Sequence, residues 1–183
     1  LAQIQDARCI EVDFDDDYNL PVAALAAAQA AVTLVAMPNS PSGTVWPLDM
    51  LDDLAGRLTG MLVIDEAYAD FAECNALSLV ASRPNVIVLR TLSKGYSLAG
   101  LRLGFGLANP DLLAGLVKVK DSYNVDAVAC RVAAAALGDQ DHKNANARKV
   151  IASRQRLVGA LTELGFAVWP SQSNFLLARP PGG

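Results

Sequence analysis

The sequence has little of what disulfide scaffolds, metal sites and histidine-based catalysis require. Its three cysteines, Cys9, Cys74 and Cys130, are an odd number and lack metal-ligand spacing. We therefore expect reduced thiols, as in cytoplasmic proteins, and no metal site. The single histidine, His142, stands in a polar stretch, which favours a solvated surface position over a catalytic base.

Positive charge and long apolar segments are also scarce. The formal net charge is −4, with 15 Lys and Arg against 19 Asp and Glu, and no dense basic cluster stands out. This balance excludes nucleic acid and anionic membranes as principal partners. The longest apolar stretch, residues 20–37, changes at Val32 from an alanine-rich pattern to a β-branched one. It predicts a short helix and a buried strand rather than a membrane span.

The chain does contain enough apolar residues for one sizeable core. Of its 183 residues, 52% are hydrophobic and 19% charged, as in ordinary globular proteins. Segments with helical and strand patterns alternate, which predicts an α/β fold. Strands are expected over residues 9–14, 32–37, 61–64, 86–89, 103–108, 166–170 and 174–179. Helices are expected over residues 21–31, 47–58, 75–81, 110–120, 126–137 and 141–164. The helix over 126–137 is expected to be buried, and the last helix offers Val150, Leu157, Val158 and Leu161 for burial.

No secretion signal opens the chain, so we expect a cytoplasmic location.

Residues 91–104 concentrate groups suited to covalent chemistry. Ser93 and Lys94 fall just past the carboxyl end of the strand over 86–89, where open α/β sheets hold ligands. Arg102 follows in a glycine-rich loop, which suits close wrapping around an anionic ligand. An isolated Ser-Lys pair is more often a solvated turn, so the interpretation depends on the whole string.

Two other strand ends carry polar candidates. Asp65 and Tyr68 follow the strand over 61–64. An acid in this position can simply cap the next turn, although the nearby lysine also allows a catalytic role. Asn39 and Ser40 lie in a proline-rich turn after the strand over 32–37.

The string Thr-Leu-Ser-Lys followed by Gly-Tyr-Ser-Leu-Ala-Gly resembles the lysine-attachment signature of fold type I aminotransferases that use pyridoxal phosphate. The Leu-Arg-Leu-Gly after it resembles the histidinol-phosphate aminotransferase branch. The resemblance implies that Lys94 forms a Schiff base with the cofactor and moves the substrate's α-proton. It implies that Ser93 and Arg102 hold the cofactor phosphate.

The same family has an Asp-Glu-Ala-Tyr motif. It implies that Asp65 keeps the cofactor's pyridine nitrogen protonated and that Tyr68 donates to its phenolic oxygen. The family's Asn-Pro-Thr-Gly loop places an asparagine against that oxygen, but Ser40 occupies this position here and Asn39 precedes it. The contact is therefore open between Asn39, Ser40 and neither. Tyr123, in a loop that resembles one of the family, either faces the substrate or packs as an ordinary aromatic.

The resemblance implies a three-layer α/β/α large domain with a mostly parallel sheet over residues 1–140. An interdomain helix and the start of a small domain follow over residues 141–183. It also implies a homodimer that exchanges an amino group between histidinol phosphate and 2-oxoglutarate in histidine biosynthesis. The family's glycine-rich phosphate loop and its substrate-binding arginine lie outside the matching stretch, and Arg179 comes too early to match that arginine. We therefore expect the chain by itself not to transaminate.

Other functions stay open. A related enzyme of the same fold, such as threonine-phosphate decarboxylase, shares every motif above, and release of carbon dioxide would distinguish it. A non-catalytic module that binds pyridoxal phosphate or a partner is a second alternative. An α/β domain without a cofactor is disfavoured by four motifs in family order. The exact amino donor is not fixed by any of them.

Overall fold

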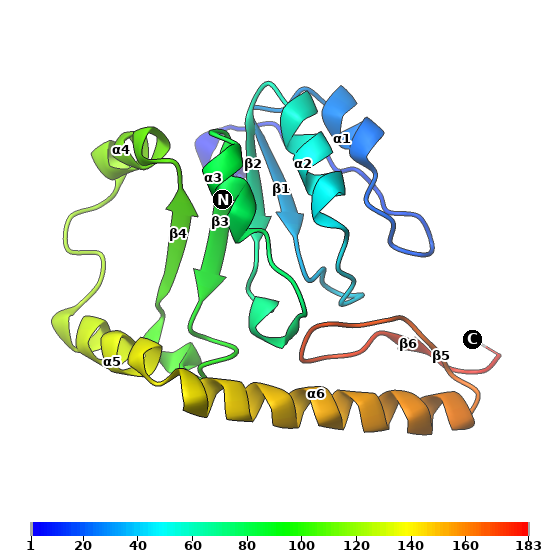
Figure 1. The fold of residues 1–183 in the computed structure, drawn as a ribbon. Helices are drawn as coiled ribbons and strands as arrows, with labels where there is room; N and C mark the ends of the chain where they lie inside the picture. Colours follow the sequence, from blue (N-terminus) through cyan, green and yellow to red (C-terminus); the bar gives the residue numbers. More distant parts are fainter. Residues whose placement is uncertain (1, 183) are drawn as a thin grey trace.

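The computed structural model describes residues 2–182 and has a four-stranded sheet at its centre (Figure 1). The strands β1 (Val32–Ala36), β2 (Met61–Asp65), β3 (Val86–Thr91) and β4 (Gly104–Ala108) lie side by side in chain order. The first three are parallel and β4 is antiparallel to β3. The predicted α/β class and the mostly parallel sheet are confirmed.

Three helices cover one face of this sheet (Figure 1). They are α1 (Val22–Ala27), α2 (Leu48–Arg57) and α3 (Leu77–Ser82). In α2 the helical spacing places Leu51 and Leu54 on one side, where both are fully buried. They belong to one cluster with Leu62 and Ile64, the residues of β2 that point to the same face. This cluster is the main core, and its packing fixes the positions of the strand ends.

The opposite face is covered only in part within the described residues. Leu112 and Leu113 of α4 (Pro110–Val119) pack there against Val63 and Ile87. Leu34, further along the same face, remains 71% exposed. In the described part of the chain, α4 is thus the second helical layer of the expected three-layer arrangement.

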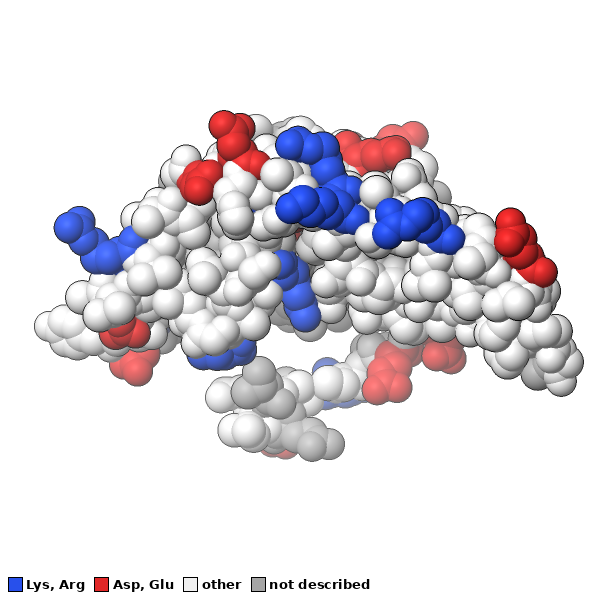
Figure 2. Space-filling model, turned by 90° about the horizontal axis from the view of Figure 1, so that it is seen from below, with Lys and Arg blue, Asp and Glu red and all other residues white. Residues whose placement is uncertain are grey.

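Below the carboxyl ends of the parallel strands run α5 (Ala127–Gly138) and α6 (Gln140–Glu163) (Figure 1). The hairpin of β5 (Ala167–Val168) and β6 (Ala178–Arg179) lies beside the distal part of α6. Figure 2 shows the underside of the molecule, where basic side chains gather over the middle and acidic ones lie nearer the margins. The long helix α6 lies beneath the carboxyl ends of the parallel strands, which is the edge of the sheet where ligands are expected.

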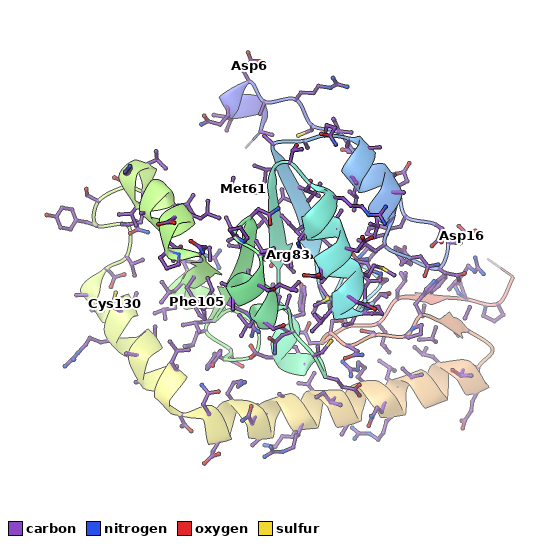
Figure 3. The ribbon with its side chains drawn as sticks, turned by 45° about the horizontal axis from the view of Figure 1, so that its top comes forward. Asp6, Asp16, Met61, Arg83, Phe105 and Cys130 are labelled. Carbon is purple, nitrogen blue, oxygen red and sulfur yellow. The ribbon has the colours of Figure 1, made fainter. Side chains whose placement is uncertain are left out.

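The burial predicted for α5 is wrong within the described residues, and the side chains that α6 offers for burial are covered only in part. Only Ala129 and Ala133 of α5 and Ala147 of α6 are buried. Leu157, expected to be covered, is 51% exposed. Most side chains of α5 meet no other element among the described residues, whereas α6 contacts η2 and β5 along part of its length. Figure 3 shows Cys130 on α5, and all three cysteines are unpaired, as predicted.

The expected strand over residues 9–14 is absent. This segment joins no sheet, and Phe14 at its end instead stacks on Trp46 with ring centroids 5.6 Å apart. The predicted first helix is also too long, because α1 ends at Ala27 and Gln29 takes a positive φ of 46°. The apolar stretch 20–37 nevertheless forms a helix and a strand as predicted. Among residues 2–182, no helix has the length and hydropathy needed to cross a membrane.

The remaining elements are single turns of 3-10 helix. They are η1 (Gln3–Gln5), η2 (Ala69–Phe71) and η3 (Ala99–Leu101). Of these, η2 follows β2 and η3 lies within the loop between β3 and β4.

Candidate active site

Two neighbouring strand ends bring the principal predicted residues together. Asp65 is the last residue of β2, and Tyr68 follows in the turn before η2. Lys94 follows β3, which is paired with β2. The Lys94 amine lies 5.2 Å from the centroid of the Tyr68 ring. The structure thus joins two motifs that the sequence only places at adjacent strand ends.

Ser93 and Arg102 stand at the two ends of the lysine loop. The Leu92 amide donates to the Leu103 carbonyl at 3.2 Å, which closes the loop at its base. Ser93 and Arg102 therefore flank the same hydrogen bond. The Thr91 hydroxyl donates to the Ser93 hydroxyl at 2.9 Å, leaving the Ser93 proton free for a ligand. A hydroxyl and a guanidinium at one loop base suit an anionic group.

The backbone of this loop has an uncommon shape. Arg102 has a φ of 53° and Ser97 a φ of 56°, both in the left-handed region that non-glycine residues rarely occupy. The Arg102 guanidinium also donates to the Ala99 carbonyl at 2.8 Å, which directs the side chain back over η3. Such conformations persist where the surrounding structure holds them, and they are frequent at ligand sites.

The Asp65 side chain fulfils one of the two roles considered for it and leaves an oxygen available for the other. One carboxylate oxygen accepts from the Ala67 amide at 3.0 Å, so the residue does cap its own turn. Within residues 2–182, its second oxygen takes part in no hydrogen bond or ion pair. The side chain is exposed at the sheet edge, and this oxygen is available to a ligand with a protonated nitrogen.

The turn after β1 leaves Asn39 and Ser40 in different settings. Asn39 is 4% exposed, and its amide donates to the Ser42 hydroxyl at 2.8 Å. Its backbone carbonyl accepts from the Gly43 amide at 2.7 Å, so Asn39 holds the turn together. Ser40 is exposed. The contact of either residue with a ligand remains a prediction.

Tyr123 lies in the turn between α4 and α5 and is 99% exposed. Within residues 2–182, no other element covers this turn, so Tyr123 does not pack as an ordinary aromatic there. Its contact with a substrate remains a prediction. His142 is exposed, as expected, and its ring nitrogen lies 2.9 Å from the Asn146 amide nitrogen.

No pattern in the sequence marks Phe175, which lies against the site. Its ring meets the Tyr68 ring edge-to-face with centroids 4.9 Å apart. The turn that carries it is held by Arg154 of α6, whose guanidinium donates to the Ser173 carbonyl at 2.6 Å. Burial lowers the pKa of Arg154, although the charge of Glu73 acts in the opposite direction. A lone aromatic in a segment predicted as a short strand has no spacing that marks it as functional.

Glu66 was also missed, although a charge directly after an apolar strand is a usable signal. It is 1% exposed, and its carboxylate accepts from the Arg90 guanidinium at 2.6 Å and from the Ala76 amide. Burial raises the pKa of Glu66, and this effect outweighs the opposing effects of the Ala76 amide and the Arg90 charge. Arg90 belongs to β3, so the pair links the two strands that carry Asp65 and Lys94.

The sequence of this chain is similar to those of known proteins. The family model for aminotransferase class I and II matches residues 1–181. A curated relative, histidinol-phosphate aminotransferase 1 of Nostoc sp. (strain PCC 7120 / SAG 25.82 / UTEX 2576), is 61% identical over 183 residues, which are 100% of this chain and 52% of the relative. The chain therefore spans about half the length of that relative.

Solved structures share the fold. Histidinol-phosphate aminotransferase from Sinorhizobium meliloti, in complex with pyridoxal-5'-phosphate, has a TM-score of 0.85 and 34% identity, with 94% of this chain and 49% of that chain covered. L-Threonine-O-3-phosphate decarboxylase from Porphyromonas gingivalis has a TM-score of 0.73 at 24% identity, with 83% of this chain and 48% of that chain covered. The second likeness shows the fold alone.

Proposed function

Since the chain belongs to the aminotransferase class I and II family, we propose that it supplies the cofactor-binding part of an aminotransferase that uses pyridoxal phosphate. The observation that carries the proposal is the approach of the Lys94 amine to within 5.2 Å of the Tyr68 ring centroid, with Asp65 and its free carboxylate oxygen at the end of the adjacent strand β2. The proposed reaction exchanges an amino group between histidinol phosphate and 2-oxoglutarate, by analogy with the Nostoc relative of that name.

The donor set of the site fits this cofactor. Pyridoxal phosphate presents an aldehyde, a phosphate dianion, a phenolic oxygen and a ring nitrogen. Lys94 offers an amine for the aldehyde. Ser93 and Arg102 flank one hydrogen bond at the base of the lysine loop and are the proposed donors to the phosphate. Asp65 offers a free oxygen for the protonated nitrogen, and Tyr68 a hydroxyl that makes no hydrogen bond within residues 2–182. Asn39 and Ser40 remain alternative donors to the phenolic oxygen.

When bound, the cofactor accepts the electrons released as the substrate's α-proton leaves. The residues of this chain provide the rest. Lys94 would hold the cofactor covalently, and its amine, when free, would accept the α-proton. Asp65 keeps a proton on the ring nitrogen through charge-assisted hydrogen bonding. Tyr68 donates its hydroxyl proton toward the phenolic oxygen, and Phe175 limits the orientations of the Tyr68 ring.

The proposal extends to the organisation of the protein. Residues 1–140 would belong to a large domain, and residues 141–183 to the interdomain helix and the first part of a small domain. An apolar surface on α4 and α5 supports a homodimer, because Val117, Val119 and Val128 are 63%, 81% and 71% exposed. Tyr123 projects from the same region. Three unpaired thiols are compatible with a cytoplasmic location.

An activity assay separates the candidate reactions. All 183 residues of this chain match about half of the Nostoc relative. The chain can therefore replace the matching part of that enzyme in a chimera. With histidinol phosphate and 2-oxoglutarate, the chimera is expected to form glutamate, while the 183-residue chain alone is not. A chimera that releases carbon dioxide from threonine phosphate instead would favour the decarboxylase, whose fold is similar. A folded chimera with neither activity would favour a non-catalytic module.

A further inference from the structure

The segment from Asp65 to Asp70 carries two kinds of side chain. Asp65 and Tyr68 belong to the candidate site, whereas Glu66 and Asp70 each form an ion pair with another element. We propose that the Glu66–Arg90 and Asp70–Lys143 pairs are positioning devices that hold Asp65 and Tyr68 in register with Lys94. This inference rests on the proposed function, because it assigns those three residues to one site.

The first pair anchors the beginning of the segment to β3. The Glu66 side chain is fully buried and that of Arg90 is 18% exposed. The Glu66 amide also donates to the Leu89 carbonyl at 2.9 Å, so backbone and side chain bind the same stretch of β3. Glu66 directly follows Asp65, and Arg90 lies just before the lysine loop. Any shift of β2 along β3 would therefore strain this pair.

The second pair anchors the end of the segment to α6 and to the lysine loop. The Lys143 amine lies 3.1 Å from an Asp70 carboxylate oxygen, with side chains 14% and 10% exposed. Gly95, the neighbour of Lys94, packs so closely that a Cβ there would collide with the Asp70 carboxylate. Lys143 also lies 5.6 Å from the centroid of the Tyr96 ring. Asp70 thus touches the loop next to the reacting lysine.

Net stability alone does not account for two such pairs. The desolvation of buried charges offsets much of their attraction, so an apolar replacement of similar volume is often neutral or better. An ion pair with hydrogen bonds is directional, however, and accepts only a narrow range of positions. Catalytic groups need that precision, because a misplacement of about 1 Å can slow a reaction about 100-fold.

Hydrogen exchange on the 183-residue chain tests this without any cofactor. In Glu66→Gln and Asp70→Asn, the hydrogen-bonded amides of Ala69 and Leu98 are expected to exchange about tenfold faster or more, while the β1–β2 ladder keeps its protection. The control is Asp52→Asn, which breaks a more exposed pair with Arg83 at 2.7 Å and should change neither loop. Arg83, labelled in Figure 3, follows α3 and precedes β3, so it lies at the amino end of that strand, away from the lysine loop.

The outcomes separate positioning from a general structural role. Unchanged exchange at both loops, or an equal acceleration across the whole sheet, would overturn the proposal. If Glu66→Gln or Asp70→Asn does not fold, Glu66→Asp and Lys143→Met replace them. Glu66→Asp keeps the charge but shortens the side chain. Lys143→Met removes only the more exposed partner of its ion pair.

A second readout uses pyridoxal phosphate itself as the probe. Borohydride trapping at Lys94 is expected to fall about tenfold in Glu66→Gln and Asp70→Asn relative to wild type and Asp52→Asn. Equal trapping in all four proteins would contradict the positioning role. If wild type traps nothing at Lys94, the proposed function fails, and the exchange pattern alone decides whether the two pairs hold the loops.

Discussion

Replacing Arg90 with methionine should destabilise the chain in a pH-dependent manner. Methionine preserves much of the side-chain length but leaves the fully buried Glu66 carboxylate with only the Ala76 amide as a partner. Removing one partner of a buried pair costs about 3–5 kcal/mol. Because the Arg90 side chain is 18% exposed, we expect the lower end of that range, about 3 kcal/mol at pH 8.

The sign of the pH dependence follows from Glu66. Burial already raises its pKa above the ordinary value near 4.5, and loss of the Arg90 charge removes an opposing effect. A raised pKa in the folded state means that protonated Glu66 favours folding. That contribution is present below the ordinary pKa and is lost as the pH rises through the folded-state pKa. The deficit of the variant relative to wild type should therefore be largest at pH 8 and shrink toward pH 4.5.

Urea unfolding followed by the fluorescence of Trp46, which is 4% exposed, measures this deficit. With a slope of about 2 kcal/mol per molar urea, a loss of about 3 kcal/mol lowers the midpoint by about 1.5 M. The control is Arg57→Met, which breaks a pair whose side chains are 53% and 49% exposed and should shift the midpoint little at any pH. A deficit below about 1 kcal/mol, or one that stays constant between pH 5 and 8, would refute the reasoning.

Three further substitutions test the site. In the chimera, Asp65→Asn should retain the cofactor but slow α-proton abstraction about 100-fold, since a neutral amide cannot hold the pyridinium proton; an unchanged single-turnover rate would remove Asp65 from the mechanism. Tyr68→Phe keeps the ring contact with Phe175 and should weaken pyridoxal-phosphate binding about tenfold in an absorbance titration, whereas equal affinity would argue against the hydroxyl contact. Arg154→Met leaves the Ser173 carbonyl without its donor and should lower the free energy of unfolding by about 1–3 kcal/mol, with no measurable change as the contrary result.

The strands at the centre of the sheet were predictable because their sequence signals are local. β1, β2 and β3 are short apolar runs whose residues face the core or a neighbouring strand, and each begins and ends close to its expected bounds. The failure at residues 9–14 has the opposite cause. Its alternation fits a strand, but pairing depends on a neighbouring strand, and no local pattern reports whether one is present.

The burial of helices was harder to predict than their existence. The sequence marks α5 and α6 clearly, yet Leu157 is 51% exposed because burial depends on what packs against the helix. The residues of the site also divide into those that local patterns mark and those that tertiary packing brings in. Lys94 and Asp65 stand at strand ends that local patterns identify, whereas Phe175 reaches Tyr68 only through the placement of a distant hairpin by α6.

The most direct test of the account is to locate the covalent bond between protein and cofactor. Purified chain is incubated with pyridoxal phosphate, reduced with borohydride, digested and mapped by mass spectrometry, with Lys94→Ala as the matched control. We expect a pyridoxyl label on the peptide that contains Lys94, and loss of that label in Lys94→Ala. A label that falls instead on Lys118, Lys120, Lys143 or Lys149, and that persists in Lys94→Ala, would contradict it.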